Sequence, residues 1–193
     1  MAKASAALAT IAIVCGLGNP DADYERTRHN AGFATVDVLA ARHGVRYWKS
    51  EAGAQVASLT WRGADGEQRE VLLAKPMSYM NTSGGPLSKL ARAHRVAPQQ
   101  ILVVHDEVDL AAGEVRLKLG GGLNAHNGLR SIADKLGSRD FARVQFGIGR
   151  PPGKMQVADY VLRELKGGFL DEFNITAESA ADLVERILTE GAK

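Results

Sequence analysis

Two polar clusters in this chain contain the residue types that acid–base chemistry at neutral pH requires. His29 stands at the threshold of a predicted helix, and Asp106 comes two residues after an apolar run that predicts a buried strand. An imidazole, with an ordinary pKa of about 6.5, is the natural general base at neutral pH, and a carboxylate beside it fixes its tautomer. We therefore expect His29 and Asp106 to meet and to activate a water molecule. The alternative for His29 alone is a surface or helix-capping residue.

Side-chain amides accompany this pair at two other predicted strand ends. Asn81 follows Met80 just ahead of a predicted helix, and Asn19 lies in the glycine-rich turn after the first predicted strand. A buried amide costs stability unless it is hydrogen-bonded, so Met80-Asn81 is more typical of a site than of a core. Open α/β sheets place their sites at the carboxyl ends of strands. The alternative is that Asn81 or Ser83 only caps the following helix.

A glycine run in a basic stretch of the chain indicates an anionic partner. The triple glycine 120–122 follows Lys118 and precedes His126 and Asn127, which open another predicted helix. Exposed backbone amides and a helix N-terminus together suit a phosphate. Segment 116–154 holds eight basic and two acidic residues, a formal charge of +6, against +2 for the whole chain. We expect nucleic acid as the partner, with a flexible surface loop and a solvated charged face as the alternatives.

Two cofactor hypotheses are weaker than this one. Asp106, Glu107 and Asp109 could hold a divalent metal, but no further carboxylate or histidine spacing completes a ligand set. The turn 16–20 lacks the third glycine and the immediate helix of a dinucleotide-binding fingerprint. The single cysteine, Cys15, lies within a predicted core strand, which is typical of a buried residue and not of a nucleophile. We expect neither a metal nor a cofactor.

The apolar pattern predicts the elements that must position these residues. Strands are expected at 10–16, 55–61, 70–74, 101–104, 114–119 and 144–148, and helices at 30–43, 83–95, 127–136 and 170–188. Interleaved strands and helices predict an α/β protein, a mixed β-sheet sandwiched by helices, in a single domain over 1–193 with a short tail at 1–9. A composition of 45% hydrophobic and 24% charged residues excludes a disordered chain. With no export signal and no membrane span in the sequence, we expect a cytoplasmic location.

Six phrases occur along the chain in a specific order: GLGNP, TRHNAG, KPMSYMNTSG, HDEVDL, KLGGG and HNGLRSI. In this order they closely resemble the bacterial peptidyl-tRNA hydrolase family, from about Ile11 to the terminal helix. The resemblance implies a monomeric esterase of translation with a mixed-sheet α/β fold that needs neither metal nor cofactor. It implies hydrolysis of the ester between peptide and tRNA in peptidyl-tRNA, by a water that a His–Asp pair activates.

The resemblance also implies a role for each matching residue. His29 corresponds to the catalytic histidine and Asp106 to its carboxylate partner. Residues expected to line the peptide and ester-carbonyl site are Asn19, Tyr24, Met80, Asn81, His126 and Asn127. Lys118 matches the lysine that holds the 5′-phosphate of tRNA, with Arg143 expected beside it.

The chain departs from the family pattern at two places. Leu123-Asn124-Ala125 stand where the family often has glycines, and Gln145 stands where the family has the second arginine of the phosphate clamp. Glutamine can donate only a neutral hydrogen bond, so phosphate affinity is expected to depend on Lys118 and nearby arginines. The flexibility of the glycine-containing loop is left open.

Two other classes of protein remain as alternatives to the esterase. One is an RNA-binding module that kept the fold and lost the chemistry, which release of peptide from a peptidyl-tRNA mimic would exclude. The other is a nucleotide-processing enzyme on a related α/β scaffold. Protection of the protein against thermal unfolding by free nucleosides would favour that second alternative.

Overall fold

A computed structural model describes residues 10–190 of the chain, so the predicted tail at 1–9 lies outside the described residues. The strands are β1 (Ile13–Gly16), β2 (Lys49–Glu51), β3 (Ala54–Arg62), β4 (Gln68–Pro76), β5 (Ile101–Glu107), β6 (Val115–Leu119) and β7 (Ala142–Gly147). The α-helices are α2 (Ala31–Arg42), α3 (Gly84–Ala93), α4 (Asn127–Leu136), α5 (Val157–Leu162) and α6 (Gly168–Glu190). Short 3-10 helices are η1 (Ala22–Tyr24), η2 (Arg28–Asn30), η3 (Met80–Thr82) and η4 (Pro98–Gln100).

The seven strands form one mixed sheet in the order β2-β3-β4-β1-β5-β7-β6. Its centre is parallel, because β1 pairs in parallel with β4 and β5, and β5 pairs in parallel with β7. Both edges are antiparallel, where the hairpin of β3 and β4 continues into β2 and where β6 pairs with β7. The predicted mixed α/β sheet is therefore confirmed.

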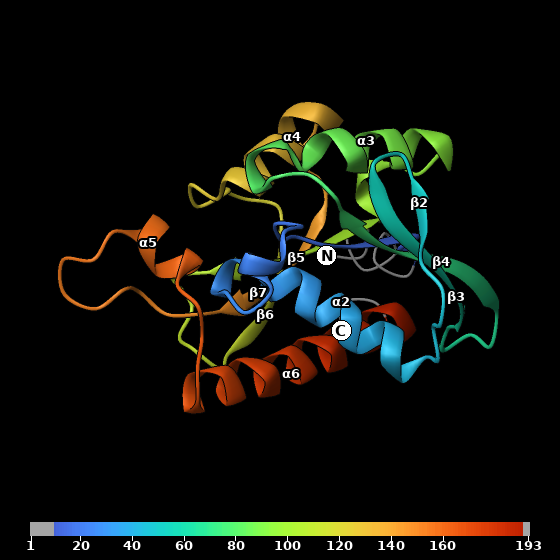
Figure 1. The fold of residues 1–193 in the computed structure, drawn as a ribbon. Coiled ribbons are helices and arrows are strands. Elements are labelled where there is room, and N and C mark those ends of the chain that lie inside the picture. The colour runs from blue at the N-terminus through green and yellow to red at the C-terminus, as the bar shows by residue number, and fades with distance from the viewer. Residues whose placement is uncertain (1–9, 191–193) are drawn as a thin grey trace.

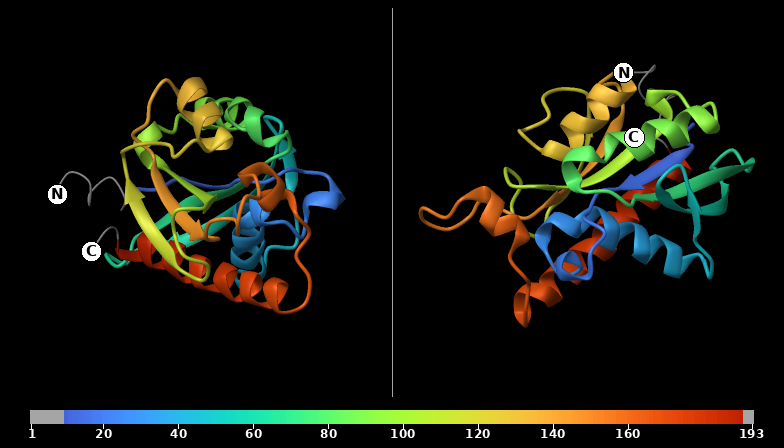
Figure 2. Two further views of the ribbon diagram at one scale, coloured as in Figure 1. Left: turned by 90° about the vertical axis from the view of Figure 1, so that its left-hand side faces the viewer. Right: turned by 45° about the horizontal axis from the view of Figure 1, so that its top comes forward.

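Helices cover both faces of this sheet (Figure 1). Helices α3 and α4 pack on one face, and α2 and α6 pack on the other, each pair closing its own hydrophobic layer. The two turned views show the same three layers, with α6 running beneath the sheet (Figure 2). The predicted apolar stripe of α6 is buried as expected: Phe173, Ala177, Ala180, Val184 and Ile187. No helix within residues 10–190 is long and apolar enough to cross a membrane.

Several elements differ from the sequence prediction: β1 begins at Ile13 and not at residue 10, and the 3-10 helices are not predicted. Strand β5 continues past Val104 to Glu107, and all seven of its residues are buried. The prediction ends at the last apolar residue, but the polar residues that follow find buried partners, described below, and so stay in the sheet. Strand β2 and helix α5, of three and six residues, are absent from the prediction, because elements this short show no periodicity.

The start of α2 lies in direct backbone contact with the sheet, because residue 32 is glycine. A Cβ added at Gly32 would lie 2.1 Å from the backbone nitrogen of Leu17 and 2.4 Å from the carbonyl oxygen of Val104. A Cβ at Gly16 would in turn lie 2.2 Å from the carbonyl oxygen of Gly32. Close packing therefore explains Gly16 of the first turn and Gly32 of α2 without a bound dinucleotide.

The substitution Gly32→Ala is expected to lower the free energy of unfolding by about 2–4 kcal/mol, because backbone atoms must move to admit the methyl group. Urea unfolding measures the change. Gly85→Ala is the matched control, since no atom lies within 4 Å of a Cβ at that helical position and alanine favours helix. Equal stability of Gly32→Ala and Gly85→Ala would contradict the close contact.

Candidate active site

The predicted polar clusters meet at the carboxyl ends of the central strands. Asp106 is the penultimate residue of β5, and His29 belongs to η2, which follows β1. His126 is the N-cap residue of α4. Since β1 and β5 are parallel neighbours, the chain segments that leave them emerge at the same edge of the sheet.

His29 and Asp106 form the hydrogen-bonded pair that the sequence predicts. The Nδ1 atom of His29 lies 3.0 Å and 3.1 Å from the two carboxylate oxygens of Asp106. A carboxylate only accepts, so Nδ1 carries the proton and Nε2 is left with a free lone pair. The side chain of His29 is 15% exposed, whereas that of Asp106 is 3% exposed. The arrangement is a buried acid behind a histidine that reaches solvent.

A second histidine holds the same carboxylate. The Nε2 atom of His126 donates to Asp106 Oδ1 at 2.9 Å, and its Nδ1 accepts from the backbone N–H groups of Gly128 and Leu129 at 3.2 Å and 3.4 Å. Because Nδ1 faces two donors, the ring must carry its proton on Nε2. The resemblance placed His126 near the peptide groove, and the structure adds a direct bond to Asp106 that fixes the carboxylate.

The pKa shifts in the cluster favour His29 as a general base beside an ionised Asp106. Burial lowers the pKa of His29, but attraction to Asp106 and the hydrogen bond to it raise that pKa by more, so the net shift is upward. Burial raises the pKa of Asp106, but His29 and His126 outweigh this and hold it well below its usual range. Asp106 is therefore an anion at neutral pH.

His105 braces this cluster without taking part in its charge. Its Nδ1 atom donates to the backbone carbonyl of Asp106 at 2.8 Å, and its ring meets that of His126 edge-on at 5.1 Å. Complete burial, with the proximity of His126, lowers the pKa of His105 to about 3. The ring is neutral and acts as packing behind His126.

The donor set of this cluster does not fit a metal ion. His29, Asp106 and His126 offer ligand atoms that all lie within 4.8 Å of one another. A metal on Nε2 of His126 would leave the proton on Nδ1, where it would point at two backbone N–H groups. Nor do the acids of the β5 end converge, since Asp109 pairs with Arg150 and Glu107 binds other partners, described below.

Asn19 joins the first turn to the segment that begins η3. Its side-chain oxygen accepts from the backbone N–H of Met80 at 2.8 Å, which leaves the side-chain amide N–H groups for the site. Asn30 holds Asn19 by two bonds, accepting from its backbone N–H at 2.9 Å and donating to its carbonyl at 3.0 Å. Met80 is buried, and its sulfur would lie 2.6 Å from a Cβ at Gly128. The Met-Asn phrase is thus tied to both the first turn and α4.

The remaining predicted site residues lie on the surface of this region. Asn81 and Asn127 are exposed and Tyr24 is half-buried. Met80 takes the buried position in this phrase, and Asn81 follows it to solvent. Ser83 stands at the N-cap position of α3, but its side chain makes no capping bond, because its hydroxyl donates to the carbonyl of Met80 at 2.9 Å. The N–H of Gly84 donates instead to the hydroxyl of Ser131 on α4 at 3.0 Å.

The glycine loop, here residues 120–126, connects β6 to α4. Lys118 lies beside it, since a Cβ at Gly121 would be 3.5 Å from its Cε atom. Arg143, directly opposite Lys118 in the sheet, is 1% exposed and donates to the carbonyls of Gly122 at 2.8 Å and of Gly120. Arg143 supports the loop from below, and its contact with a phosphate stays a prediction.

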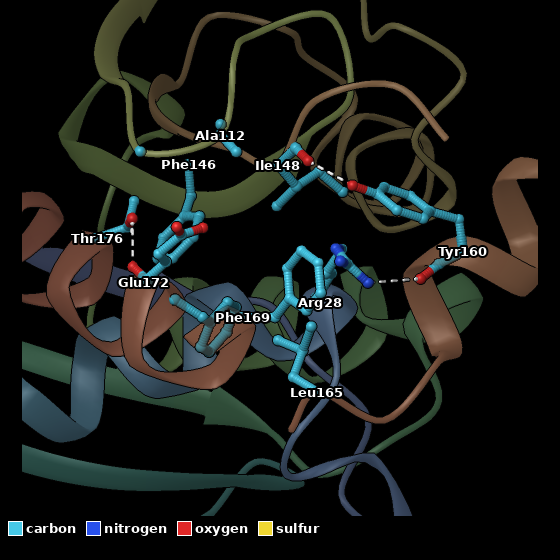
Figure 3. A pocket seen from close by; sticks show the side chains of 12 residues that line it. Arg28, Ala112, Phe146, Ile148, Tyr160, Leu165, Phe169, Glu172 and Thr176 are labelled. Atoms are coloured by element: carbon cyan, nitrogen blue, oxygen red, sulfur yellow. Dashed lines mark hydrogen bonds between the residues drawn. The ribbon is translucent and has the colours of Figure 1, made fainter. Parts of the chain in front are cut away.

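Two hollows flank the segment that carries His29. The larger, of about 870 Å³, starts at Asn19 and Asn30 and runs between α2 and α6. Neither hollow is lined by His29 or Asp106, and the smaller, of about 100 Å³, is lined by Arg28 (Figure 3). There Arg28 lies 4.0 Å from the ring centroid of Tyr160, whose hydroxyl donates to the carbonyl of Ile148 at 2.7 Å. These contacts of Arg28 and Tyr160 connect the segment that carries His29 to α5 and to the residue that follows β7.

Sequence reasoning missed two polar residues that organise the site. Asn30 and Glu107 both stand inside recognised phrases, yet the sequence assigns no role to Asn30 and considers Glu107 only as part of the weaker metal hypothesis. Each is buried, Asn30 at 3% and Glu107 at 4% exposure. A signal is present for Glu107, since an acid that continues an apolar strand must find donors if it is buried. For Asn30 the partner is a backbone turn, which sequence does not identify.

The site combines a histidine hydrogen-bonded to a buried aspartate with side-chain amides, at the edge of a mixed α/β sheet. This arrangement is typical of a hydrolase. The family model described as Peptidyl-tRNA hydrolase matches residues 13–193. Peptidyl-tRNA hydrolases of Nocardia farcinica and Frankia alni are 50% and 48% identical to the chain over 180 and 179 residues. The alignments cover 93% of this chain and 91% and 88% of those relatives.

Among solved structures, peptidyl-tRNA hydrolase from Acinetobacter baumannii aligns with a TM-score of 0.83 at 34% identity. The match covers 93% of this chain and 89% of that one. The chain therefore belongs to the peptidyl-tRNA hydrolase family and is a hydrolase. The resemblance of its motifs is confirmed, and the alternative of an inactive RNA-binding module finds no support among these relatives.

Proposed function

We propose that this protein hydrolyses the ester bond between peptide and tRNA in peptidyl-tRNA, releasing both. One observation carries the proposal: Nδ1 of His29 lies 3.0 Å and 3.1 Å from the carboxylate oxygens of Asp106, on a side chain that is 15% exposed. In the neutral ring the proton is therefore on Nδ1, and Nε2 is unprotonated. A base in this form can take a proton from water, and a positioned base typically contributes a factor of ~10²–10⁴ in rate.

The proposed reaction needs no covalent intermediate. Water attacks the carbonyl carbon of the ester while Nε2 of His29 takes its proton, and Asp106 offsets the positive charge on the ring. The tetrahedral intermediate then breaks its bond to the ribose oxygen, which receives the proton from His29. The products are a peptide carboxylic acid and a free ribose hydroxyl. Cys15 cannot be a nucleophile here, because it is fully buried in β1 and burial raises the pKa of its thiol.

Side-chain amides are proposed to hold the ester and the peptide. Asn19 is oriented by Met80 and Asn30, so its amide N–H groups have a fixed direction. Fixed donors of this kind stabilise the oxyanion more than the neutral carbonyl. Exposed Asn81 and Asn127 can complete the set once substrate is bound. The hollow of about 870 Å³ that begins at Asn19 is proposed as the path of the peptide.

The glycine loop and Lys118 are proposed to hold the 5′-phosphate of tRNA. Lys118, which is half-buried on β6, supplies a cation, and the loop supplies backbone amides beside it. Arg143 is proposed to set the loop's shape through Gly120 and Gly122.

Incubation with tRNA that carries a labelled peptide tests the proposed activity. Release of free peptide together with tRNA that can be charged again would show that the ester, and not the RNA chain, was cut. Intact substrate at high enzyme concentration would refute the proposal. Stabilisation of the protein by free nucleosides, but not by tRNA, would instead favour a nucleotide-processing enzyme.

Replacing Lys118 by alanine is expected to raise KM about tenfold at low salt, because a charge-assisted contact with phosphate is lost. The slope of log KM against log salt concentration should fall by about one unit, while kcat changes little. Lys49→Ala, on β2 at the opposite edge of the sheet, is the matched control and should leave both quantities unchanged. An unaltered salt slope in Lys118→Ala would remove Lys118 from the phosphate contact.

A further inference from the structure

The two departures of this chain from its family's motifs meet at one atom. Oε2 of Glu107 accepts from the side-chain amide of Asn124 at 2.9 Å and from that of Gln145 at 2.8 Å. Its other oxygen, Oε1, accepts from the backbone N–H of Asp109 at 3.1 Å. Glu107 and Gln145 are 4% and 6% exposed, so their bond forms away from water, whereas Asn124 is an exposed loop residue whose amide reaches in to the same oxygen. Gln145 is thus committed to Glu107 and does not face a phosphate.

The glycine loop is anchored along its whole length by buried groups of β5 and β7. Arg143 holds the carbonyls of Gly120 and Gly122, and Glu107 holds the side chain of Asn124. At the end of the loop, His126 donates to Asp106. Successive residues of a strand point to opposite faces, so the loop crosses the end of β5 and is tied to both of its acids.

Backbone conformation explains why such anchoring is needed. Asn124 and Ala125 have φ of 48° and 59°, in the left-handed region that glycine adopts without cost. Asparagine tolerates this region better than most residues, but alanine does not. A loop with these residues keeps the conformation only if its surroundings impose it. The bond from Asn124 to Glu107 is the side-chain contact placed to do so.

We propose that Glu107 is a positioning residue that holds the glycine loop in its substrate-binding conformation before tRNA arrives. Through Asn124 it fixes the approach of the chain to His126, and through His126 the orientation of Asp106. Asn124 and Gln145, which stand where the family has other residues, are the side-chain donors that bind the carboxylate of Glu107. The role of the loop in binding tRNA rests on the proposed function, whereas its anchoring does not.

Glu107→Gln is the first test. The introduced side chain has one oxygen, which the backbone N–H of Asp109 occupies, so its NH₂ group faces the amides of Asn124 and Gln145. Those amides must turn over to accept from it, and any bond they regain is neutral where the original is charge-assisted.

The expected result of Glu107→Gln is a fall in kcat/KM of about tenfold or more, with kcat affected through His126. Hydrogen exchange of the amides of His126, Gly128 and Leu129 should also accelerate about tenfold or more without tRNA. The N–H of His126 bonds the carbonyl of Leu123 in the loop, and those of Gly128 and Leu129 bond the His126 ring, so their exchange measures how firmly the loop end and the ring are held.

The double variant Glu107→Gln with Asn124→Asp supplies the rescue. The glutamine introduced at position 107 can accept from the backbone N–H of Asp109 and donate to the carboxylate introduced at position 124. A charge-assisted bond then spans the same gap with its polarity reversed. The double variant is expected to recover slow hydrogen exchange and at least half of the lost activity on a logarithmic scale.

Asn124→Gly is the matched control. Glycine relieves the strain of the left-handed backbone conformation but removes the bond to Glu107, so this variant should resemble Glu107→Gln in hydrogen exchange.

Two results would overturn the proposal. One is wild-type exchange and wild-type kcat in Glu107→Gln. The other is an equal loss in the single and the double variants, which would mean that Glu107 matters only as buried volume or charge. Hydrogen exchange is measured on the free protein, so a wild type that fails to release peptide would refute the proposed function and still leave the loop anchoring testable.

Discussion

Replacing His29 by alanine is expected to lower the rate of peptide release by about 10²–10⁴-fold, because the substitution removes the imidazole nitrogen that is free to take a proton from water. His126 cannot take over, since its Nε2 proton is already donated to Asp106 and its Nδ1 faces backbone donors. Binding of tRNA should change little, because the proposed phosphate contact lies on Lys118 and the glycine loop. Single-turnover release and filter binding, measured on the same preparation, separate the two quantities.

His94→Ala is the matched control for that experiment. His94 also pairs with a carboxylate, Glu51, at 2.6 Å, but its side chain is 30% exposed and lies at the end of α3, away from Asp106. Its replacement should leave release unchanged. Turnover that survives in His29→Ala, at a rate near that of the control, would refute the assignment of His29 as the base.

The pairing of His29 with Asp106 could be predicted although 77 residues separate them. Asp106 continues a buried strand, and His29 lies on the segment that follows β1, beyond η1. Parallel strands bring their carboxyl ends together, so the sheet pattern predicts that both segments start at one edge. The same logic places Asn19 there. Strand ends are a strong signal because the hydrophobic pattern that defines them is long and regular.

The orientation of individual side chains could not be predicted in this way. The family motif puts His126 near the peptide, yet the N-terminus of α4 turns its ring so that Nδ1 accepts from two amides and Nε2 reaches Asp106. Arg143 is expected at a phosphate, yet cross-strand pairing places it beneath the loop and buries it. These outcomes depend on which donors and acceptors meet in three dimensions, and a residue's type and spacing do not contain that information.

The connection of Asn124 and Gln145 through Glu107 could not be predicted from the sequence either. Sequence identifies both positions as unusual, but treats them separately, as a question of flexibility and a question of phosphate affinity. The structure joins them at Glu107 Oε2, so the neutral Gln145 is matched to a neutral Asn124 around one carboxylate. A coupling of this kind is a property of the buried polar network, in which each donor is chosen for the acceptor left by its neighbours.

The substitution Asp106→Asn is expected to be nearly as damaging as the loss of His29, with kcat reduced about 10³-fold or more. His126 binds Oδ1 of the carboxylate, so the one oxygen of an asparagine must stay at that position to keep this bond. The NH₂ group then replaces Oδ2, which lies 3.1 Å from Nδ1 of His29. The retained Oδ1 still lies 3.0 Å from the same Nδ1 but is shared with His126, so the donor at the Oδ2 place weakens the preference for a proton on Nδ1. It admits the ring with Nδ1 accepting and its proton on Nε2, which is the tautomer that cannot act as a base.

The pH dependence distinguishes this explanation from general damage to the site. In the wild type, attraction to Asp106 and the hydrogen bond to it raise the pKa of His29 against the opposing effect of burial. Activity that needs neutral His29 should therefore rise with pH through that raised value. Without the carboxylate only burial remains, so the acid limb of the kcat/KM profile should move to lower pH in Asp106→Asn while its plateau falls.

Asp182→Asn is the control, because Asp182 lies on α6 with a 70% exposed side chain and pairs with Arg42. It should leave both the plateau and the acid limb unchanged. A reduced plateau in Asp106→Asn with the acid limb at its wild-type pH would mean that the titrating group does not sense Asp106. The base would then have to be sought elsewhere, because a histidine whose Nδ1 lies 3.0 Å from a buried anion cannot lose that anion without a change in its pKa.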